Sequence, residues 1–266
     1  MRPLAVVGNL SRDLVDGSPP RAGGAPFHAA RALRVLGRPA LVGAKCADSD
    51  RDSLLTPLVR LGLPVLWRGG SSTAAFSFRY EGDRRVMVVE ALGDPWGPAD
   101  LYGLERANWV HVGALARSDF PAETVAELAR DRRVSLDGQG LVRPGRTGPL
   151  ELDSDYDPEV LRHVSILKLA EEEARTLVGE PNESALRSLG VPEVVVTLGS
   201  EGSLVLAKGT LERVPARSAG SGVDPTGAGD AFSAVYLASR SSGHSPVAAA
   251  RQATALVAGL LARRIP

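Results

Sequence analysis

The chain has 266 residues, enough for one large domain with a sizeable core. Its 31 basic and 31 acidic side chains cancel to a formal net charge of zero, which argues against nucleic acid or an anionic membrane as a partner. A single cysteine, Cys46, excludes an intrachain disulfide and a multi-cysteine metal site. No apolar run has the length of a signal peptide or a membrane span, so we expect a cytoplasmic protein with a small ligand.

The N-terminal segment alternates between strand and helix patterns. The run LAVVGNLSRD predicts a short buried strand that ends at Gly8, with Asp13 just beyond it. After Gly23 and Gly24, apolar residues at helical spacing predict a helix that ends near Gly37. The run RPALVGAK then predicts the next strand.

Two stretches break this alternation. Residues 72–91 alternate in polarity, turn at Glu81-Gly82-Asp83 and return, which predicts a β-hairpin. Because this hairpin would be inserted in a sheet of another type, it is a candidate lid. Residues 202–215 predict a second hairpin, with its turn at Lys208 and Gly209, that closes one edge of a sheet.

The remaining strand-like runs are each followed by turn or helix residues. They are ANWVHVGAL, RRVSLDGQG, VSILKLAEEEA and PEVVVTLGSEG. This repetition predicts the α/β class, with a doubly wound, mainly parallel sheet flanked by helices. No internal repeat or low-complexity linker divides the chain, so we expect a single domain over residues 1–266 that carries the 72–91 hairpin as a small β lid. In such a sheet, ligands bind at the carboxyl ends of the strands.

The segment VDPTGAGDAF, residues 223–232, is the strongest candidate for chemistry. Gly227, Ala228 and Gly229 would leave backbone N–H groups unobstructed ahead of a helix predicted over about 231–240, which suits a phosphate anion. Asp230 lies in the same turn, where its carboxylate can accept the proton of an attacking hydroxyl. An isolated Gly-x-Gly-Asp is also ordinary helix-capping chemistry, so the motif alone leaves both interpretations open.

Two other classes of phosphate loop do not fit this segment. Gly222 and Gly227 have the spacing of a P-loop, but Ala228 and Gly229 stand where Lys and Ser/Thr are required. No glycine-rich run completes the dinucleotide fingerprint after the first strand. The missing fingerprint disfavours an enzyme that transfers hydride with a dinucleotide.

VDPTGAGDAF resembles the C-terminal signature of the ribokinase-like (PfkB) family of carbohydrate and nucleoside kinases. The likeness extends over most of the chain. VVGNLSRD resembles the first strand and substrate aspartate of that family, GGAPFHAARALRVLG its Gly-Gly signature, LKLAEEEA its Asn-x-x-Glu region, and VVVTLGSEG its nucleotide-side strand and loop. Five segments in the family's order favour the catalytic interpretation of Asp230.

The resemblance implies roles around the C-terminal signature. Asp230 would be the base that activates the acceptor hydroxyl, and Gly227, Ala228 and Gly229 would form the anion hole. The resemblance also implies ATP as donor, and Glu173 as the residue that organises the waters around Mg²⁺. Asp224 and Thr226 match positions that help to order the signature loop. In some family members they do so through a monovalent cation such as K⁺.

The resemblance also divides the binding positions into two groups. Asp13, Gly23 and Gly24 match positions that line the acceptor-sugar pocket. His28 stands where many sugar kinases place a substrate-binding Asn, although a packed histidine is an equal alternative. The nucleotide side is matched by three residues, Thr197, Gly199 and Gly202.

Two features point to a branch of the family. The segment between Asp13 and Gly23 is too short for the long N-terminal lid excursion of ribokinase, so we expect the lid to consist mainly of the 72–91 hairpin. Together with DGQGLVR, this form resembles the inositol- and polyol-kinase-like branch. In that run Asp137, Gln139 and Arg143 either contact acceptor hydroxyls or phosphate, or belong to an ordinary polar loop after a strand.

The leading hypothesis is an ATP-dependent kinase that uses Mg²⁺ and phosphorylates a hydroxyl of a small sugar or cyclitol, with a myo-inositol-like acceptor favoured. One alternative is a nucleoside kinase. Another is a sugar-sensing protein on the same fold, because Ala170 stands where the family has its Asn. The edge of a lid hairpin needs protection, and pairing of two lids predicts a homodimer.

Overall fold

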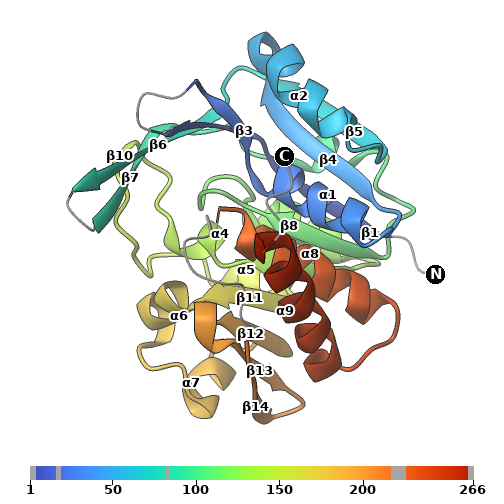
Figure 1. Ribbon diagram of the computed structural model, residues 1–266, viewed down its shortest axis with the longest axis vertical. Coiled ribbons are helices and arrows are strands. Elements are labelled where there is room, and N and C mark those ends of the chain that lie inside the picture. The colour runs from blue at the N-terminus through green and yellow to red at the C-terminus, as the bar shows by residue number, and fades with distance from the viewer. Residues whose placement is uncertain (1–3, 16–18, 82–83, 217–225, 263–266) are drawn as a thin grey trace.

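The computed structural model describes residues 4–15, 19–81, 84–216 and 226–262. In these segments, nine strands form the larger sheet, in the order β14-β13-β12-β11-β9-β8-β1-β4-β5 (Figure 1). The strands from β12 to β5 in that order pair in parallel, and β13 and β14 add an antiparallel edge. The α/β prediction and the hairpin at 202–215 are therefore confirmed. The strands are β1 (Leu4–Asn9), β4 (Leu41–Ala47), β5 (Val65–Gly70), β8 (Trp109–Gly113), β9 (Arg133–Asp137), β11 (Ile166–Ala170), β12 (Glu193–Thr197), β13 (Ser203–Ala207) and β14 (Thr210–Val214).

Helices cover both faces of the larger sheet because its central strands are apolar on both sides. In β1, Leu4 and Val6 pack with α1, α8 and α9, which lie in front of the sheet in Figure 1. The alternate residues Ala5 and Val7 belong to the core cluster of the opposite face, to which α3, α5, α6 and α7 also contribute. The helices are α1 (Ala25–Val35), α2 (Arg51–Val59), α3 (Ala122–Ala129), α4 (Gln139–Val142), α5 (Glu159–Arg162), α6 (Glu171–Val178), α7 (Glu183–Arg187), α8 (Ala228–Ser241) and α9 (Pro246–Ala262).

None of the described helices is both long enough and apolar enough to cross a membrane.

A buried polar cluster fixes α8 against the larger sheet. Glu193, at the start of β12, accepts hydrogen bonds from the hydroxyl of Tyr236 at 2.6 Å and from Nη2 of Arg240 at 2.8 Å. Burial and the adjacent carboxylate of Glu193 raise the pKa of Tyr236, so its phenol stays protonated and donates. Since both donors lie on α8, these bonds hold the helix in place and thereby position its first turn.

The hairpin predicted at 72–91 is present, as part of a second sheet of five described strands in the order β10-β7-β6-β2-β3. This smaller sheet projects to one side of the larger one in Figure 1. Phe76 and Phe78 of the hairpin are 4% and 7% exposed and pack with Val89 and Leu115, so they form a packing face. The strands are β2 (Ser11–Val15), β3 (Arg21–Gly23), β6 (Ala74–Glu81), β7 (Arg84–Ala91) and β10 (Gly148–Pro149).

The smaller sheet has more strands than the hairpin that the sequence predicts. The first strand ends at Asn9, and after Leu10 the chain enters β2, which pairs in parallel with β6. Asp13 therefore lies on a strand of the smaller sheet, beyond the end of β1. Strands of two or three residues, such as β10 and β3, are too short to carry a periodic pattern, and their pairing partners are distant in the sequence.

Candidate active site

The carboxyl ends of the parallel strands form one edge of the larger sheet, and α8 begins against it. Asp137 ends β9, and Lys168 lies two residues before the end of β11. A Cβ atom built on Gly229, in the first turn of α8, would lie 3.0 Å from Nζ of Lys168. The sequence motif of α8 and the strand ends therefore meet in space, as expected for a ligand site in an open α/β sheet.

The first turn of α8 presents free backbone donors. The first helical hydrogen bond runs from Ala231 N to Gly227 O at 2.9 Å, so the N–H groups just before it have no acceptor within the helix. Gly227 has a φ of +77°, in the left-handed region, and a Cβ atom there would overlap Nδ1 of His28. The helix begins at Ala228, earlier than the predicted 231, and its free donors form the kind of site that binds an anion.

The carboxyl group of Asp230 is poised for proton transfer. Its Oδ1 is shielded from solvent and has no hydrogen-bond partner among the described residues. Burial raises the pKa of Asp230 to about 7, the charge of Asp137 adds to this effect, and Lys168 and Arg143 oppose it. A carboxyl group with a pKa near neutrality can take a proton from a hydroxyl and later release it.

Lys168 is a site residue that the motifs did not identify. It is 5% exposed, and its Nζ lies 3.3 Å from Oδ2 of Asp137, which is fully buried. Burial alone would lower the pKa of Lys168, but the carboxylates of Asp137, Glu173 and Asp230 more than offset this and raise it. The available signal was a lysine inside the apolar strand run SILKLA, where a charge needs a partner. Asp137 lies beneath the site as the counter-ion of Lys168.

The predicted acceptor residues meet the anion hole from the other side. The carboxylate of Asp13 accepts a hydrogen bond from Ser11 Oγ at 2.7 Å. Gly23 on β3 pairs with Ser11, and a Cβ atom on Gly23 would overlap the Asp13 carboxylate. Gly24 forms the N-cap of α1, and His28 on this helix reaches Gly227. Asp13 also raises the pKa of Asp230 through its charge, so the acceptor residues and the base share one electrostatic environment.

Arg143 connects the site with the smaller sheet. Its guanidinium carbon lies 6.0 Å from the centre of the Phe76 ring on β6. Its positive charge acts to lower the pKa of Asp230 and of Glu173. Gln139, at the start of α4, donates its backbone N–H to Oδ1 of Asp137 at 3.3 Å. Two residues of this run therefore act on the base by their charge, Asp137 raising its pKa and Arg143 lowering it.

A cavity of about 760 Å³ opens beside Lys168 and Gly229. Two of the predicted nucleotide-side residues, Thr197 and Gly199, line it. Gly202 lies instead against the end of β14, where a Cβ atom would overlap the carbonyl oxygen of Val214. The described lining of the cavity is polar or small, and it consists of Lys168, Ala170, Glu171, Glu172, Arg175, Thr176, Thr197, Gly199 and Gly229.

Glu173 fits an indirect role toward a magnesium ion. Its Oε2 accepts a hydrogen bond from Ala170 N at 2.7 Å, and its side chain is buried, which raises its pKa. Within the described ranges, no three His, Cys, Asp or Glu residues gather as ligands for a metal. A single carboxylate suits Mg²⁺ that keeps its waters and is held chiefly by phosphate oxygens. Asp224 lies outside the described residues, and Thr226 is exposed just before Gly227.

Comparison with known proteins gives one consistent result. A family model described as pfkB family carbohydrate kinase matches residues 19–263. The ribokinase of Bacillus subtilis (strain 168) is 29% identical over 274 residues, which cover 94% of this chain and 90% of that protein. A solved pyrophosphate-dependent kinase in the ribokinase family, complexed with a pyrophosphate analog and myo-inositol, is 26% identical with a TM-score of 0.86, over 99% of this chain and 96% of that one. A sulfate complex of a pyrophosphate-dependent kinase in the ribokinase family is 25% identical with a TM-score of 0.84, over 97% and 95% of the two chains.

Proposed function

The chain belongs to the pfkB family of carbohydrate kinases, and from that premise we propose that it transfers a phosphoryl group to a hydroxyl of a small sugar or cyclitol, with a myo-inositol-like acceptor favoured. One observation carries the proposal. The unpartnered Oδ1 of Asp230 lies in the same helical turn as free backbone donors, so a proton acceptor and an anion site are adjacent.

In the proposed reaction, the acceptor hydroxyl gives its proton to the carboxylate of Asp230. The acceptor oxygen forms a bond to the terminal phosphorus of the donor, while the bond from that phosphorus to its bridging oxygen breaks. The negative charge on the transferring group faces the N–H groups of Ala228 and Gly229, at the positive end of α8. Because phosphoryl transfer needs little covalent help, positioning and charge stabilisation supply most of the catalysis.

A small polyhydroxylated acceptor fits the groups around Asp230. Asp13 offers a carboxylate that accepts hydrogen bonds from sugar hydroxyls, and Arg143 and His28 offer donors nearby. The smaller sheet meets the site where Arg143 approaches the Phe76 ring, and there it would help to exclude water from such a ligand. The likeness to a kinase whose solved complex contains myo-inositol supports a cyclitol in this place.

ATP with Mg²⁺ is the proposed donor. The cavity beside Gly229 has about 760 Å³, which falls in the range of small-molecule and cofactor sites. Thr197 and Gly199 line it and match the nucleotide side of the family signature. Glu173 would hold Mg²⁺ through water, and the ion would supply positive charge that offsets the charge of the phosphates.

Pyrophosphate is a second candidate donor, and the character of the cavity favours it. None of the described residues that line the cavity is aromatic or a large aliphatic residue on which a base could pack. Lys168 and Arg175 instead supply positive charge suited to a polyphosphate. The similar solved structures include a pyrophosphate-dependent kinase bound to a pyrophosphate analog.

A product assay with two donors and a panel of acceptors tests this proposal. The protein would be incubated with Mg²⁺ and either ATP or pyrophosphate, together with myo-inositol, other cyclitols, pentoses, hexoses or nucleosides, and the products identified by mass spectrometry. We expect a phosphorylated cyclitol or sugar with one donor. Phosphorylation of nucleosides alone would identify a nucleoside kinase. Donor binding without any product would favour the sugar-sensing alternative.

A further inference from the structure

The ammonium group of Lys168 has unused hydrogen-bonding capacity. It carries three N–H donors, and among the described residues it has one acceptor, Asp137 Oδ2, at the long distance of 3.3 Å. A buried charge without full hydrogen bonding is costly, so its other donors require acceptors from elsewhere.

The position of this ammonium indicates where those acceptors come from. Lys168 lines the 760 Å³ cavity together with Gly229. Its Nζ approaches Gly229 closely enough that a Cβ atom there would lie 3.0 Å away. The ammonium therefore stands beside the free N–H groups of α8, where the donor cavity meets Asp230.

The charges around Lys168 also leave room for an anionic ligand. Three carboxylates act on it, from Asp137, Glu173 and Asp230. Burial raises the pKa of Glu173 and of Asp230, which favours their protonated forms, whereas the pKa of Asp137 is lowered by its contact with Lys168 despite burial. Asp137 is the carboxylate that bonds the ammonium directly, and the remaining donors of the ammonium are available to phosphate oxygens.

We propose that Lys168 is a catalytic residue that donates hydrogen bonds to the phosphoryl group in transit between donor and acceptor. This inference rests on the proposed function, and it holds for either donor because both deliver the same group to the anion hole. The ammonium adds a full positive charge to the partial charges of the backbone N–H groups. Such a charge stabilises the transition state most strongly in a site that excludes water.

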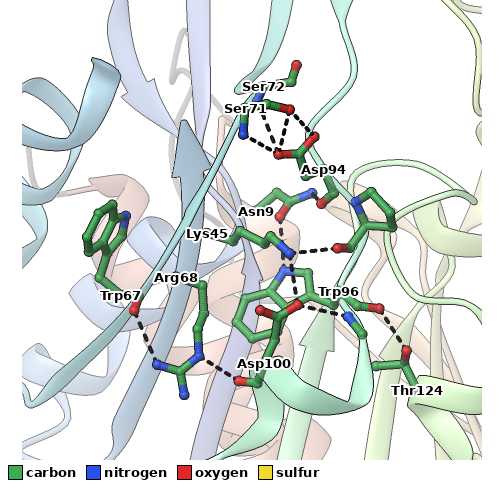
Figure 2. A network of polar contacts seen from close by, with 12 residues as sticks. Asn9, Lys45, Trp67, Arg68, Ser71, Ser72, Asp94, Trp96, Asp100 and Thr124 are labelled. Carbon is green, nitrogen blue, oxygen red and sulfur yellow. Dashed lines mark hydrogen bonds and ion pairs between the residues drawn. The ribbon is translucent and has the colours of Figure 1, made fainter. Parts of the chain in front are cut away.

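Lys45 provides a matched control within the same chain. It is also buried, on β4, and it donates to Pro95 O at 2.7 Å and to Asp100 Oδ2 at 2.8 Å (Figure 2). Both lysines thus form an ion pair with an aspartate, which is fully buried at Asp137 and partly exposed at Asp100, and of the two lysines the described lining of the cavity includes only Lys168. Removal of either pair tests the effect of losing an ion pair. Only removal of the Lys168 pair also tests contact with the phosphoryl group.

The experiment compares two double variants. Lys168→Met with Asp137→Asn removes both partners of one ion pair, so that Asp137 is not left as a buried carboxylate without its ammonium, and Lys45→Met with Asp100→Asn does the same for the other pair. Binding of ATP and of inorganic pyrophosphate, each with Mg²⁺, is measured by titration calorimetry, and kcat and KM are measured on the best acceptor. Circular dichroism and melting establish that both variants fold. The variant Lys168→Arg tests whether another cationic side chain at this position retains activity.

We expect the Lys168 pair variant to lose about 10² in kcat or more, and about tenfold in donor affinity. The Lys45 pair variant should stay within about threefold of wild type, and Lys168→Arg should recover part of kcat. Equal losses in the two double variants, or wild-type binding and kcat without Lys168, would overturn the inference. So would a wild-type protein that binds neither probe. Donor binding that depends on Lys168, without turnover on any acceptor, would leave its contact with the donor phosphates standing but overturn both its catalytic role and the proposed function.

Discussion

Two buried lysines lie in regions of the molecule that differ in how fully their polar groups are bonded. In the Lys45 cluster (Asn9, Lys45, Asp94, Trp96 and Asp100), Lys45 has two short bonds, and both ends of the Asn9 amide are used, by Asp94 O at 3.2 Å and Trp96 Nε1 at 2.9 Å (Figure 2). These bonds tie the segment around Trp96 to the ends of β1 and β4. The cluster therefore holds structure, because its polar groups bond chiefly to one another and to the neighbouring backbone.

The Lys168 cluster (His111, Asp137, Lys168, Glu173 and Asp230) is under-bonded by comparison. Oδ1 of Asp230 and Nε2 of His111 are buried and have no partner among the described residues, and Lys168 has one long bond. Burial lowers the pKa of His111 to about 4, so its ring stays neutral beside Lys168. Native proteins rarely leave buried polar groups unmet, and functional sites are among the main exceptions. The difference between the clusters separates a structural network from a site prepared for a ligand.

The largest effect should be seen in stability, when one partner of the saturated pair is removed. Lys45→Met leaves the Asp100 carboxylate without its ammonium, and we expect a loss of about 3 kcal/mol in the free energy of unfolding. The comparison is made by denaturant titration with the Lys45→Met, Asp100→Asn double variant, which should recover more than half of that loss. A single variant as stable as wild type would show that the Lys45 cluster does not hold the segment around Trp96.

A smaller but still large effect is expected at the junction of acceptor and anion sites. In Gly227→Ala the new Cβ atom must displace His28, and the residue must keep a φ of +77° that alanine adopts at a cost of about 1 kcal/mol. Because displacement of reacting groups by about 1 Å can cost 10² in rate, we expect kcat/KM to fall about 10²-fold. His28→Ala in the same background removes the overlap and should restore part of the rate. Unchanged kcat/KM in Gly227→Ala would contradict the close contact.

Much of the frame of this site was predictable because it is encoded locally. The strand runs, the helix after Gly24, and the hairpins at 72–91 and 202–215 each carry a periodic pattern or turn residues, and the structure confirms them. The family signature marked Asp230 and its glycines. Local pattern was sufficient for these elements, whereas α2, α9 and β5 are as long and were not predicted.

The rest depends on contacts between distant segments. Nothing near Lys168 in the sequence indicates that Asp137, Glu173 and Gly229 surround it, because these residues come from three other elements. The contact between His28 and Gly227 joins segments separated by almost the whole chain. The strands β2, β3 and β10 are short and acquire their sheet only through β6 and β7. Tertiary packing decides these features, and the periodicity of the sequence carries no information about that packing.

The dependence of kcat/KM on pH tests the ionisation of one residue of the Lys168 cluster, Asp230. Burial raises the pKa of Asp230 to about 7, and its ionised form is the base, so kcat/KM should rise roughly tenfold between pH 6 and pH 8. A rate that is flat over this range would contradict the perturbed environment of Asp230.

The same shift has a consequence of opposite sign for stability. Between pH 3.8 and about 7 the native state binds more protons at Asp230 than the unfolded state does, so this group makes the protein less stable as pH rises. Asp230→Asn removes that loss. Its melting temperature should exceed that of wild type by a few degrees at pH 8 and by less at pH 4, which scanning calorimetry can measure.

The central claim is that Asp230 is the base of a phosphoryl transfer, and one measurement tests it most directly. Turnover of the best donor and acceptor pair is compared between wild type and Asp230→Asn, with donor binding measured on the same samples. We predict that the variant folds, binds the donor, and loses at least about 10² in kcat. A folded variant that binds the donor and keeps more than about a tenth of the wild-type kcat would contradict the account.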